Sequence, residues 1–158
     1  LRADPRVEVR ERTDIRAVAP AEVGGTFDVV VADLSFISLR AVLPSLLALA
    51  TPGAPVVVLV KPQFEAGRQE VSRGRGIVRD PLVWRRVLEE VADAARAQGA
   101  GLAAATVSPI TGAQGNVEFL VHLVQPVMPG AGAGVGPAEV DLGAVVDEAV
   151  RLHVDPLR

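Results

Sequence analysis

The chain has 158 residues, a formal net charge of −3 and no cysteine. This length fits one domain with a sizeable core, and the lack of cysteine excludes disulfides, a thiolate nucleophile and cysteine-based metal sites. His122 and His153 are too few and too far apart for a zinc motif, so we expect no metal. Without a signal-peptide pattern or an apolar run of about 20 residues, we expect a cytoplasmic chain with no membrane partner.

The first half of the chain predicts a βαβ unit. Among the first twenty residues, which are rich in charge, only Val7 and Val9 alternate as in a short strand. The β-branched run at 27–33 predicts a buried strand, and leucines and valines at helical spacing predict a helix over 38–50. A second apolar run at 56–60 predicts a strand parallel to the first, because strand, helix and strand follow one another.

The second half predicts one more helix and a pair of strands. Residues 64–79 have no apolar period and are rich in Gly and Arg, so we expect a long ordered loop there. A helix is expected over 81–98, with Trp84 at its rim. The runs at 102–107 and 117–124 predict two strands, and the short connection between them implies an antiparallel hairpin.

The composition changes after residue 125. Residues 126–138 are rich in Gly, Ala and Pro, which predicts a flexible linker. Residues 139–158 carry one amphipathic helix, which could dock on the body or lie free. We therefore divide the chain into a domain over 1–125, a linker over 126–138 and a tail helix over 139–158.

Lys61 is the single lysine of a chain that has fifteen arginines. An ammonium group can lose its proton near neutral pH when its surroundings disfavour charge, whereas a guanidinium effectively cannot. We therefore interpret Lys61 as a general base or as a compact charge at the mouth of a cleft. The alternative is a chance surface residue.

The predicted topology brings three polar positions to one edge of the sheet. Asp33 and Lys61 each follow the carboxyl end of a predicted strand, and Glu118 stands near the start of the antiparallel last strand. Ligands of open α/β sheets bind outside the carboxyl ends of the strands, so all three are candidate site residues. Taken singly, each could be structural, with Asp33 capping a turn and Glu118 exposed on a sheet face.

Basic residues gather between Lys61 and Arg86, where seven of them stand against three acidic residues. A protein whose whole surface binds nucleic acid carries a positive net charge, whereas the net charge of this chain is negative. A polyanionic partner could therefore be met on one side only. A solvated arginine-rich loop is the alternative.

Three unusual motifs follow one another along the chain. They are Asp33-Leu34-Ser35-Phe36-Ile37-Ser38-Leu39, then Val60-Lys61-Pro62-Gln63-Phe64-Glu65, then Ser108-Pro109-Ile110-Thr111-Gly112 with Gly115-Asn116-Val117-Glu118-Phe119. In order and spacing they strongly resemble the TlyA-type proteins. That family is often labelled hemolysin but consists of ribosomal RNA 2′-O-methyltransferases of the FtsJ-like class. The resemblance covers about residues 1–124.

The resemblance implies an α/β fold, namely part of a Rossmann-like, S-adenosylmethionine-dependent methyltransferase domain with a C-terminal antiparallel β-hairpin. In the family an S4 RNA-binding domain, a first catalytic lysine and a glycine-rich cofactor loop precede the matched region. We therefore expect this chain to be the C-terminal portion of a longer enzyme. We also expect a bare hydrophobic edge along 29–31 and weak or absent cofactor binding by this segment alone.

The family's catalytic set is Lys-Asp-Lys-Glu, and the resemblance puts Asp33, Lys61 and Glu118 in its last three places. It implies ribose 2′-O-methylation in ribosomal RNA, with Lys61 as the base. Asp33 would orient the cofactor and the lysines, and Glu118 would accept a hydrogen bond that fixes Lys61 or the ribose. Cofactor binding would involve Asp14, Asp33, Leu34 and Ser35, and the phosphates of ribosomal RNA or ribosomal subunits would be held by Arg68, Arg73, Arg75 and Arg79.

Two other functions stay open. The residues 33–36 faintly resemble the Asp-Pro-Pro-Tyr motif of methyltransferases that act on amino groups, although a nitrogen nucleophile needs no lysine base. A non-catalytic RNA-binding or interaction module is the second alternative. A membrane-lytic role has no support, because the tail helix is acidic where such helices are rich in lysine.

Overall fold

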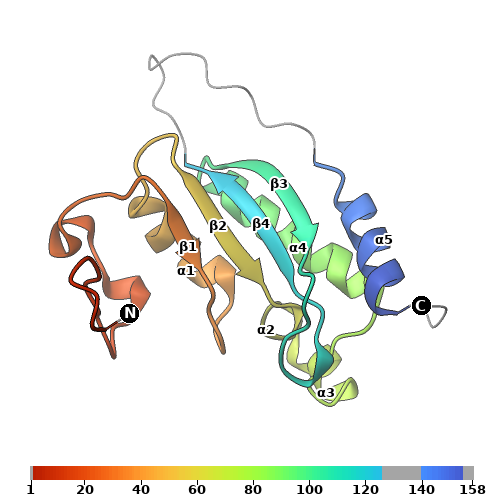
Figure 1. The fold of residues 1–158 in the computed structure, drawn as a ribbon. Helices are drawn as coiled ribbons and strands as arrows, with labels where there is room; N and C mark the ends of the chain where they lie inside the picture. The colour runs from red at the N-terminus through yellow and green to blue at the C-terminus, as the bar shows by residue number, and fades with distance from the viewer. Residues whose placement is uncertain (1, 126–139, 155–158) are drawn as a thin grey trace.

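The computed structural model describes residues 2–125 and 140–154, and its centre is a four-stranded mixed sheet with the order β1-β2-β4-β3 (Figure 1). The strands are β1 (Val30–Ala32), β2 (Pro55–Val60), β3 (Gly101–Val107) and β4 (Phe119–Val124). β1 and β2 are parallel, whereas β4 is antiparallel to both of its neighbours. The α/β class and the antiparallel pairing of the last two strands are thus confirmed, and β4 lies between β2 and β3.

The helices cover one face and one edge of this sheet. α1 (Leu39–Ala48) connects β1 to β2, and α4 (Pro81–Ala97) connects β2 to β3; the two helices contact each other behind the sheet (Figure 1). The short elements are α2 (Pro62–Glu65), α3 (Arg68–Arg73) and the 3-10 turns η1 (Ile15–Ala17), η2 (Pro20–Val23) and η3 (Ala113–Gly115).

The core lies between the sheet and the helices α1 and α4. Every second residue of β2 (Val56, Val58 and Val60) is fully buried on that face. Trp84 is also fully buried, so the expected position at the helix rim is wrong. Its indole Nε1 donates to the Val78 carbonyl at 2.9 Å, and its ring meets Phe119 edge-on at 6.1 Å. In a core with few aromatics, this pair fills the largest single volume.

The structure shortens one predicted strand and lacks another. The strand expected over 27–33 is found only at β1, because β1 is an edge strand that pairs with β2 at three positions. Phe27 makes an isolated bridge to Ala50. No strand forms at Val7 and Val9, which lie exposed in irregular backbone. A short alternation needs a partner strand, and the described residues offer none there.

The stretch 64–79 is not the long loop that its composition predicts, because α2 and α3 lie within or beside it. Pro62 occupies the first position of α2, where the missing N–H is not needed. In α3, Glu70 accepts a hydrogen bond from the Gly67 N–H at 3.3 Å and so caps the helix start. Neither helix has an apolar stripe; α2 begins at a proline and α3 is capped by Glu70.

The tail helix docks on the body. α5 (Leu142–His153) falls within the predicted range 139–158 and buries one apolar face against α4 and β3. Asp141 caps it by accepting from the Ala144 N–H at 3.0 Å, and His153 Nε2 lies 3.2 Å from the Ser108 carbonyl oxygen. The predicted linker over 126–138 lies outside the described residues. Within 2–125 and 140–154, no helix has the length and apolar character that a bilayer span requires.

The opposite face of the sheet and the outer edge of β1 stay open in the described part of the chain. Val29 is 57% exposed and Val31 is 74% exposed, which confirms the expected bare edge. Thus the two faces differ, because only one of them has helices packed on it.

A matched pair of substitutions tests this asymmetry. Val58→Ala should lower the free energy of unfolding by about 2 kcal/mol, because it leaves a cavity in a packed core. Val31→Ala should change it by less than about 0.5 kcal/mol, because the side chain is in solvent. Urea denaturation followed by circular dichroism measures both, and equal losses would show that the open face is covered in solution.

Candidate active site

Two of the three predicted site residues are in direct contact at one edge of the sheet. Asp33 follows β1 and Lys61 follows β2, and the Lys61 Nζ lies 2.5 Å from the Asp33 Oδ1. The same amine donates to the Ser35 Oγ at 3.3 Å. The Lys61 side chain is 12% exposed and that of Asp33 is 67% exposed, so the amine is inside and the carboxylate faces solvent. The prediction that these two residues meet is confirmed.

Glu118 contacts Gln63 rather than Lys61. Its carboxylate is buried, with the residue 7% exposed, and Oε1 accepts a hydrogen bond from the Gln63 Nε2 at 3.3 Å. No ion pair links Glu118 to Lys61 among the described residues. Because Gln63 is two residues beyond Lys61, the carboxylate still lies next to the segment that bears the amine. The alternative interpretation, in which Glu118 is an exposed residue on a sheet face, is therefore wrong.

Gly112 makes the space that the Glu118 carboxylate occupies. A Cβ atom added to Gly112 would stand 2.6 Å from the carboxyl carbon of Glu118, which is far inside van der Waals contact. The backbone φ of −73° at Gly112 suits any residue, so the requirement for glycine is steric. The Gly112 N–H donates to the Asn116 carbonyl at 2.8 Å and keeps this backbone in place.

Asn116 ties the connection before β4 to the arginine-bearing segment. It is buried, its Oδ1 accepts from the Val78 N–H at 3.1 Å, and its Nδ2 donates to the carbonyls of Gly76 and Ala113 at 3.0 and 3.2 Å. All of its polar atoms thus have partners. The backbone next to Glu118 and the backbone that carries Arg75 and its neighbours are therefore fixed relative to each other.

Glu65 connects the residues after Lys61 to the residues after Asp33. It ends α2, and its hydrogen-bond donors lie at the start of α1. Its carboxylate is almost fully buried and accepts from the Leu39 N–H and the Ser38 Oγ, both at 2.6 Å. These donors form the first turn of α1, where a negative charge is favoured by the helix dipole. The Arg40 Nε is 3.4 Å away. Glu65 therefore fixes the end of the residues 33–38 against the helix that follows Lys61.

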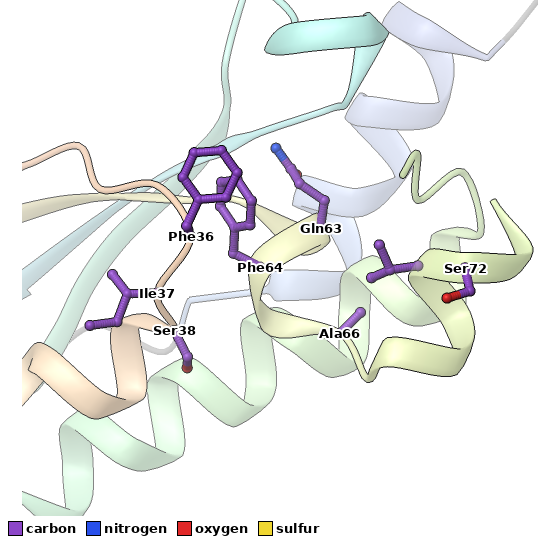
Figure 2. A pocket seen from close by; sticks show the side chains of 8 residues that line it. Phe36, Ile37, Ser38, Gln63, Phe64, Ala66 and Ser72 are labelled. Carbon is purple, nitrogen blue, oxygen red and sulfur yellow. The ribbon is translucent and has the colours of Figure 1, made fainter. Parts of the chain in front are cut away.

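A groove of about 410 Å³ opens between the residues that follow Asp33 and those that follow Lys61 in the chain (Figure 2). Its lining includes Phe36, Gln63 and Phe64, and Figure 2 shows the two rings next to each other with the Gln63 side chain alongside. The ring centroids are 5.1 Å apart. Phe36 is 91% exposed and has a φ of 64°, a left-handed conformation that is strained for an aromatic residue. An exposed aromatic ring held in this way is available for stacking.

The remaining predicted residues have different surroundings. Both carboxylate oxygens of Asp14 accept from Arg16, whose guanidinium lowers the pKa of Asp14 to about 2. Leu34 packs on the core, and Ser35 is the exposed residue that accepts from Lys61. The cofactor-binding role of Asp14 stays a prediction. No cluster of three or more metal-ligating side chains occurs in the described residues.

The arginines of this region divide into two groups. Arg73, Arg75 and Arg79 are exposed and form no ion pair within the described part of the chain. Arg86, by contrast, donates to Glu90 at 2.8 Å and to Glu70 at 2.5 Å, and these two carboxylates raise the pKa of Arg86. The Arg68 side chain is not described. The first group is therefore available for an anionic partner.

Sequence reasoning left four contributors to the site without a role, namely Phe36, Gln63, Glu65 and Gly112. All four stand in the motifs that carry the resemblance. A buried carboxylate such as Glu65 could have been sought from its position just after a predicted strand. The need for glycine at Gly112 depends on where Glu118 lies in space, so the sequence gives no signal for it.

The comparisons with known proteins establish the family. The FtsJ-like methyltransferase family matches residues 1–125, and the chain therefore belongs to the FtsJ-like methyltransferases. Its Rossmann-like fold agrees with that of a solved candidate hemolysin from Lactococcus lactis, with a TM-score of 0.83 and 38% identity over 94% of this chain and 68% of the other.

Curated relatives carry names that point to ribosomal RNA. A Bacillus subtilis protein named as a candidate rRNA methyltransferase, YqxC, is 46% identical over 94% of this chain and 52% of its own length. The 16S/23S rRNA (cytidine-2′-O)-methyltransferase TlyA of Mycobacterium tuberculosis is 48% identical over 78% of this chain and 46% of its own length. The chain thus spans about half the length of the curated relatives that it matches.

The steric role of Gly112 can be tested by adding one methyl group. Gly112→Ala should push the Glu118 carboxylate from its position and lower the free energy of unfolding by about 1–3 kcal/mol, as overpacking does. Gly67→Ala is the control, because a Cβ there would have its nearest neighbour at 3.9 Å. Thermal denaturation compares the two variants, and an unchanged melting temperature for Gly112→Ala would contradict the steric explanation.

Proposed function

We propose that a polypeptide carrying this domain transfers a methyl group from S-adenosylmethionine to the 2′-hydroxyl of a ribose in ribosomal RNA. The observation that carries this proposal is the ion pair of Lys61 with Asp33, 2.5 Å long, beside the buried carboxylate of Glu118. Relatives from Mycobacterium tuberculosis and Campylobacter jejuni are named as rRNA (cytidine-2′-O)-methyltransferases. We extend that substrate, a cytidine ribose, to this protein.

Lys61 is the group that we assign to the proton of the ribose hydroxyl. An unactivated hydroxyl is a poor nucleophile, so a positioned base contributes typically 10²–10⁴ in rate. The amine comes from a side chain that is almost completely withdrawn from water and is held by Asp33 and Ser35. These two contacts hold Nζ just past the end of β2, where we propose that the ribose hydroxyl approaches it. Arginine could not take this role because its guanidinium does not deprotonate.

Asp33 fits the cationic cofactor that the family implies. Its carboxylate is mostly in solvent and has more acceptor sites than its ion pair with Lys61 uses, so it can accept from a further donor. When bound, S-adenosylmethionine supplies a methyl group on a positively charged sulfur. Leu34 and Ser35 would lie along it, and Asp14 is proposed for the adenine. The segment lacks a glycine-rich strand-to-helix loop among its described residues, so we expect it to bind the cofactor weakly by itself.

The exposed arginines support an RNA substrate. Arg73, Arg75 and Arg79 lie on the segment that Asn116 fixes next to the Glu118 backbone, and we propose that they hold phosphates of ribosomal RNA together with Arg68. Phosphate contacts position a nucleic acid without reading its sequence. The groove with Phe36 and Phe64 would then receive the nucleotide whose ribose faces Lys61.

The assignment of Lys61 is tested by Lys61→Arg in the complete polypeptide. The variant keeps the charge, so the affinity for ribosomal RNA should stay within about twofold, while turnover should fall by about 100- to 10,000-fold because the base is lost. Methyl incorporation from radiolabelled S-adenosylmethionine into ribosomal subunits measures turnover.

The reverse exchange Arg96→Lys, at the distant end of α4, is the control and should keep full turnover. Near-normal turnover of Lys61→Arg would remove the base assignment. If the unmodified protein binds ribosomal RNA and transfers no methyl group, the non-catalytic RNA-binding module takes the place of the proposed function.

The arginine assignment predicts a change in salt dependence. For a single-stranded ribosomal RNA fragment, the slope of log K against log salt should become shallower by about 0.7 for each phosphate contact that is lost. The double change Arg73→Gln with Arg75→Gln should show this loss by fluorescence anisotropy. Arg96→Gln, whose native residue pairs with Asp93, is the control. An unchanged slope in the double variant would place the RNA elsewhere.

A further inference from the structure

Gln63 has one satisfied end and one unsatisfied end. Its Nε2 donates to the buried carboxylate of Glu118 at 3.3 Å. Its Oε1 is buried without any hydrogen-bond partner among the described residues. A buried acceptor without a partner costs about 1–3 kcal/mol, so its persistence calls for an explanation.

The orientation of this amide follows from the chemistry of its neighbour. An ionised carboxylate can only accept hydrogen bonds, so the NH₂ end of Gln63 must face Glu118 and the carbonyl must point elsewhere. Gln63 lines the groove that also contains Phe36 and Phe64 (Figure 2). The unsatisfied group of this lining residue is therefore a buried hydrogen-bond acceptor, and the partner that it lacks is a donor.

We infer that Gln63 reads the base of the methylated nucleotide, with its Oε1 accepting from the exocyclic amino group of cytosine. This inference rests on the proposed function and adds a residue that determines base specificity. Cytosine presents an N4 amino donor at the position where uracil presents the O4 acceptor. Because the NH₂ group of Gln63 donates to Glu118, the side chain cannot turn this donor toward the O4 of uracil without losing that contact.

The groove fits such a planar ligand. It has a volume of about 410 Å³, and its lining, which begins two residues after Lys61 at Gln63, carries two phenylalanine rings that offer stacking surfaces. Because the Oε1 is buried in this state, a base must move neighbouring side chains to reach it; the Phe36 ring in the same lining is 91% exposed and has room to move. A site that is built to hydrogen-bond a substrate group discriminates strongly against the analogue that lacks the group.

The test compares two substrates in methyl transfer by the complete polypeptide. Once the methylated nucleotide has been mapped, an rRNA fragment with cytidine at that position is compared with the same fragment carrying uridine. The native protein should prefer cytidine at least tenfold in kcat/KM, which corresponds to about 1.4 kcal/mol. In Gln63→Leu this preference should fall to threefold or less. The matched control Gln98→Leu, at the exposed end of α4, should keep it.

A ratio of substrates separates base reading from a merely structural role. Loss of the Gln63 contact to Glu118 would lower kcat for cytidine and uridine alike, so the ratio would stay unchanged. Gln63→Glu provides the second variant, since it retains an acceptor but repels Glu118. It should lose rate and keep the preference for cytidine. Circular dichroism confirms that each variant is folded.

The outcomes distinguish this inference from the function on which it rests. Equal use of cytidine and uridine by the native protein, or an unchanged preference in folded Gln63→Leu, would overturn the role of Gln63 while methyl transfer stands. The absence of methyl transfer to either fragment and to ribosomal subunits would overturn the proposed function, and the inference with it.

Discussion

The direction of β4 is the constraint on which the candidate site depends. β4 runs antiparallel to β2, and its register pairs Phe119 with Val60. Glu118 comes just before that pair and Lys61 just after it, so both leave the sheet at the same edge. If β4 ran the other way, its start would lie at the far end of a six-residue ladder, about 20 Å away at 3.3 Å per residue. Asp33 reaches the same edge because β1 is parallel to β2.

Polar contacts then fix the positions of the side chains that leave the strands at this edge. The carboxylate of Glu65 is buried and its hydrogen bonds are short, whereas the ion pairs of Arg40 and Arg86 with Glu90 lie at the surface. Surface pairs contribute little individually, whereas the buried carboxylate of Glu65 attaches the start of α1 to the segment after Lys61 through charge-assisted hydrogen bonds. Glu118 is confined in a similar way by Gln63 on one side and by Gly112 on the other.

Much of this arrangement could be predicted from local patterns. The apolar runs located β2 and β4, helical spacing located α1 and α4, and the order of the strands sufficed to bring Asp33 next to Lys61. The position of β4 between β2 and β3 could not be predicted, because hydrophobic periodicity does not record which strands are neighbours. Trp84 could have been placed in the core, since it lies four residues before the buried Leu88 on one helix face. The helices α2 and α3 were missed because each is too short for a periodic stripe.

The exposed edge of β1 leaves the sheet open to extension by another strand. β1 pairs only with β2, so its other side has no strand partner among the described residues, and Val31 lies in solvent; Lys61 contacts Asp33 and Ser35, and Glu118 contacts Gln63. A further parallel strand could therefore pair with this free side of β1. The turn at the end of that strand would arrive beside Asp33. The sheet can thus be extended strand by strand at this edge, and the loop after each added parallel strand lies at the same end of the sheet as Asp33 and Lys61.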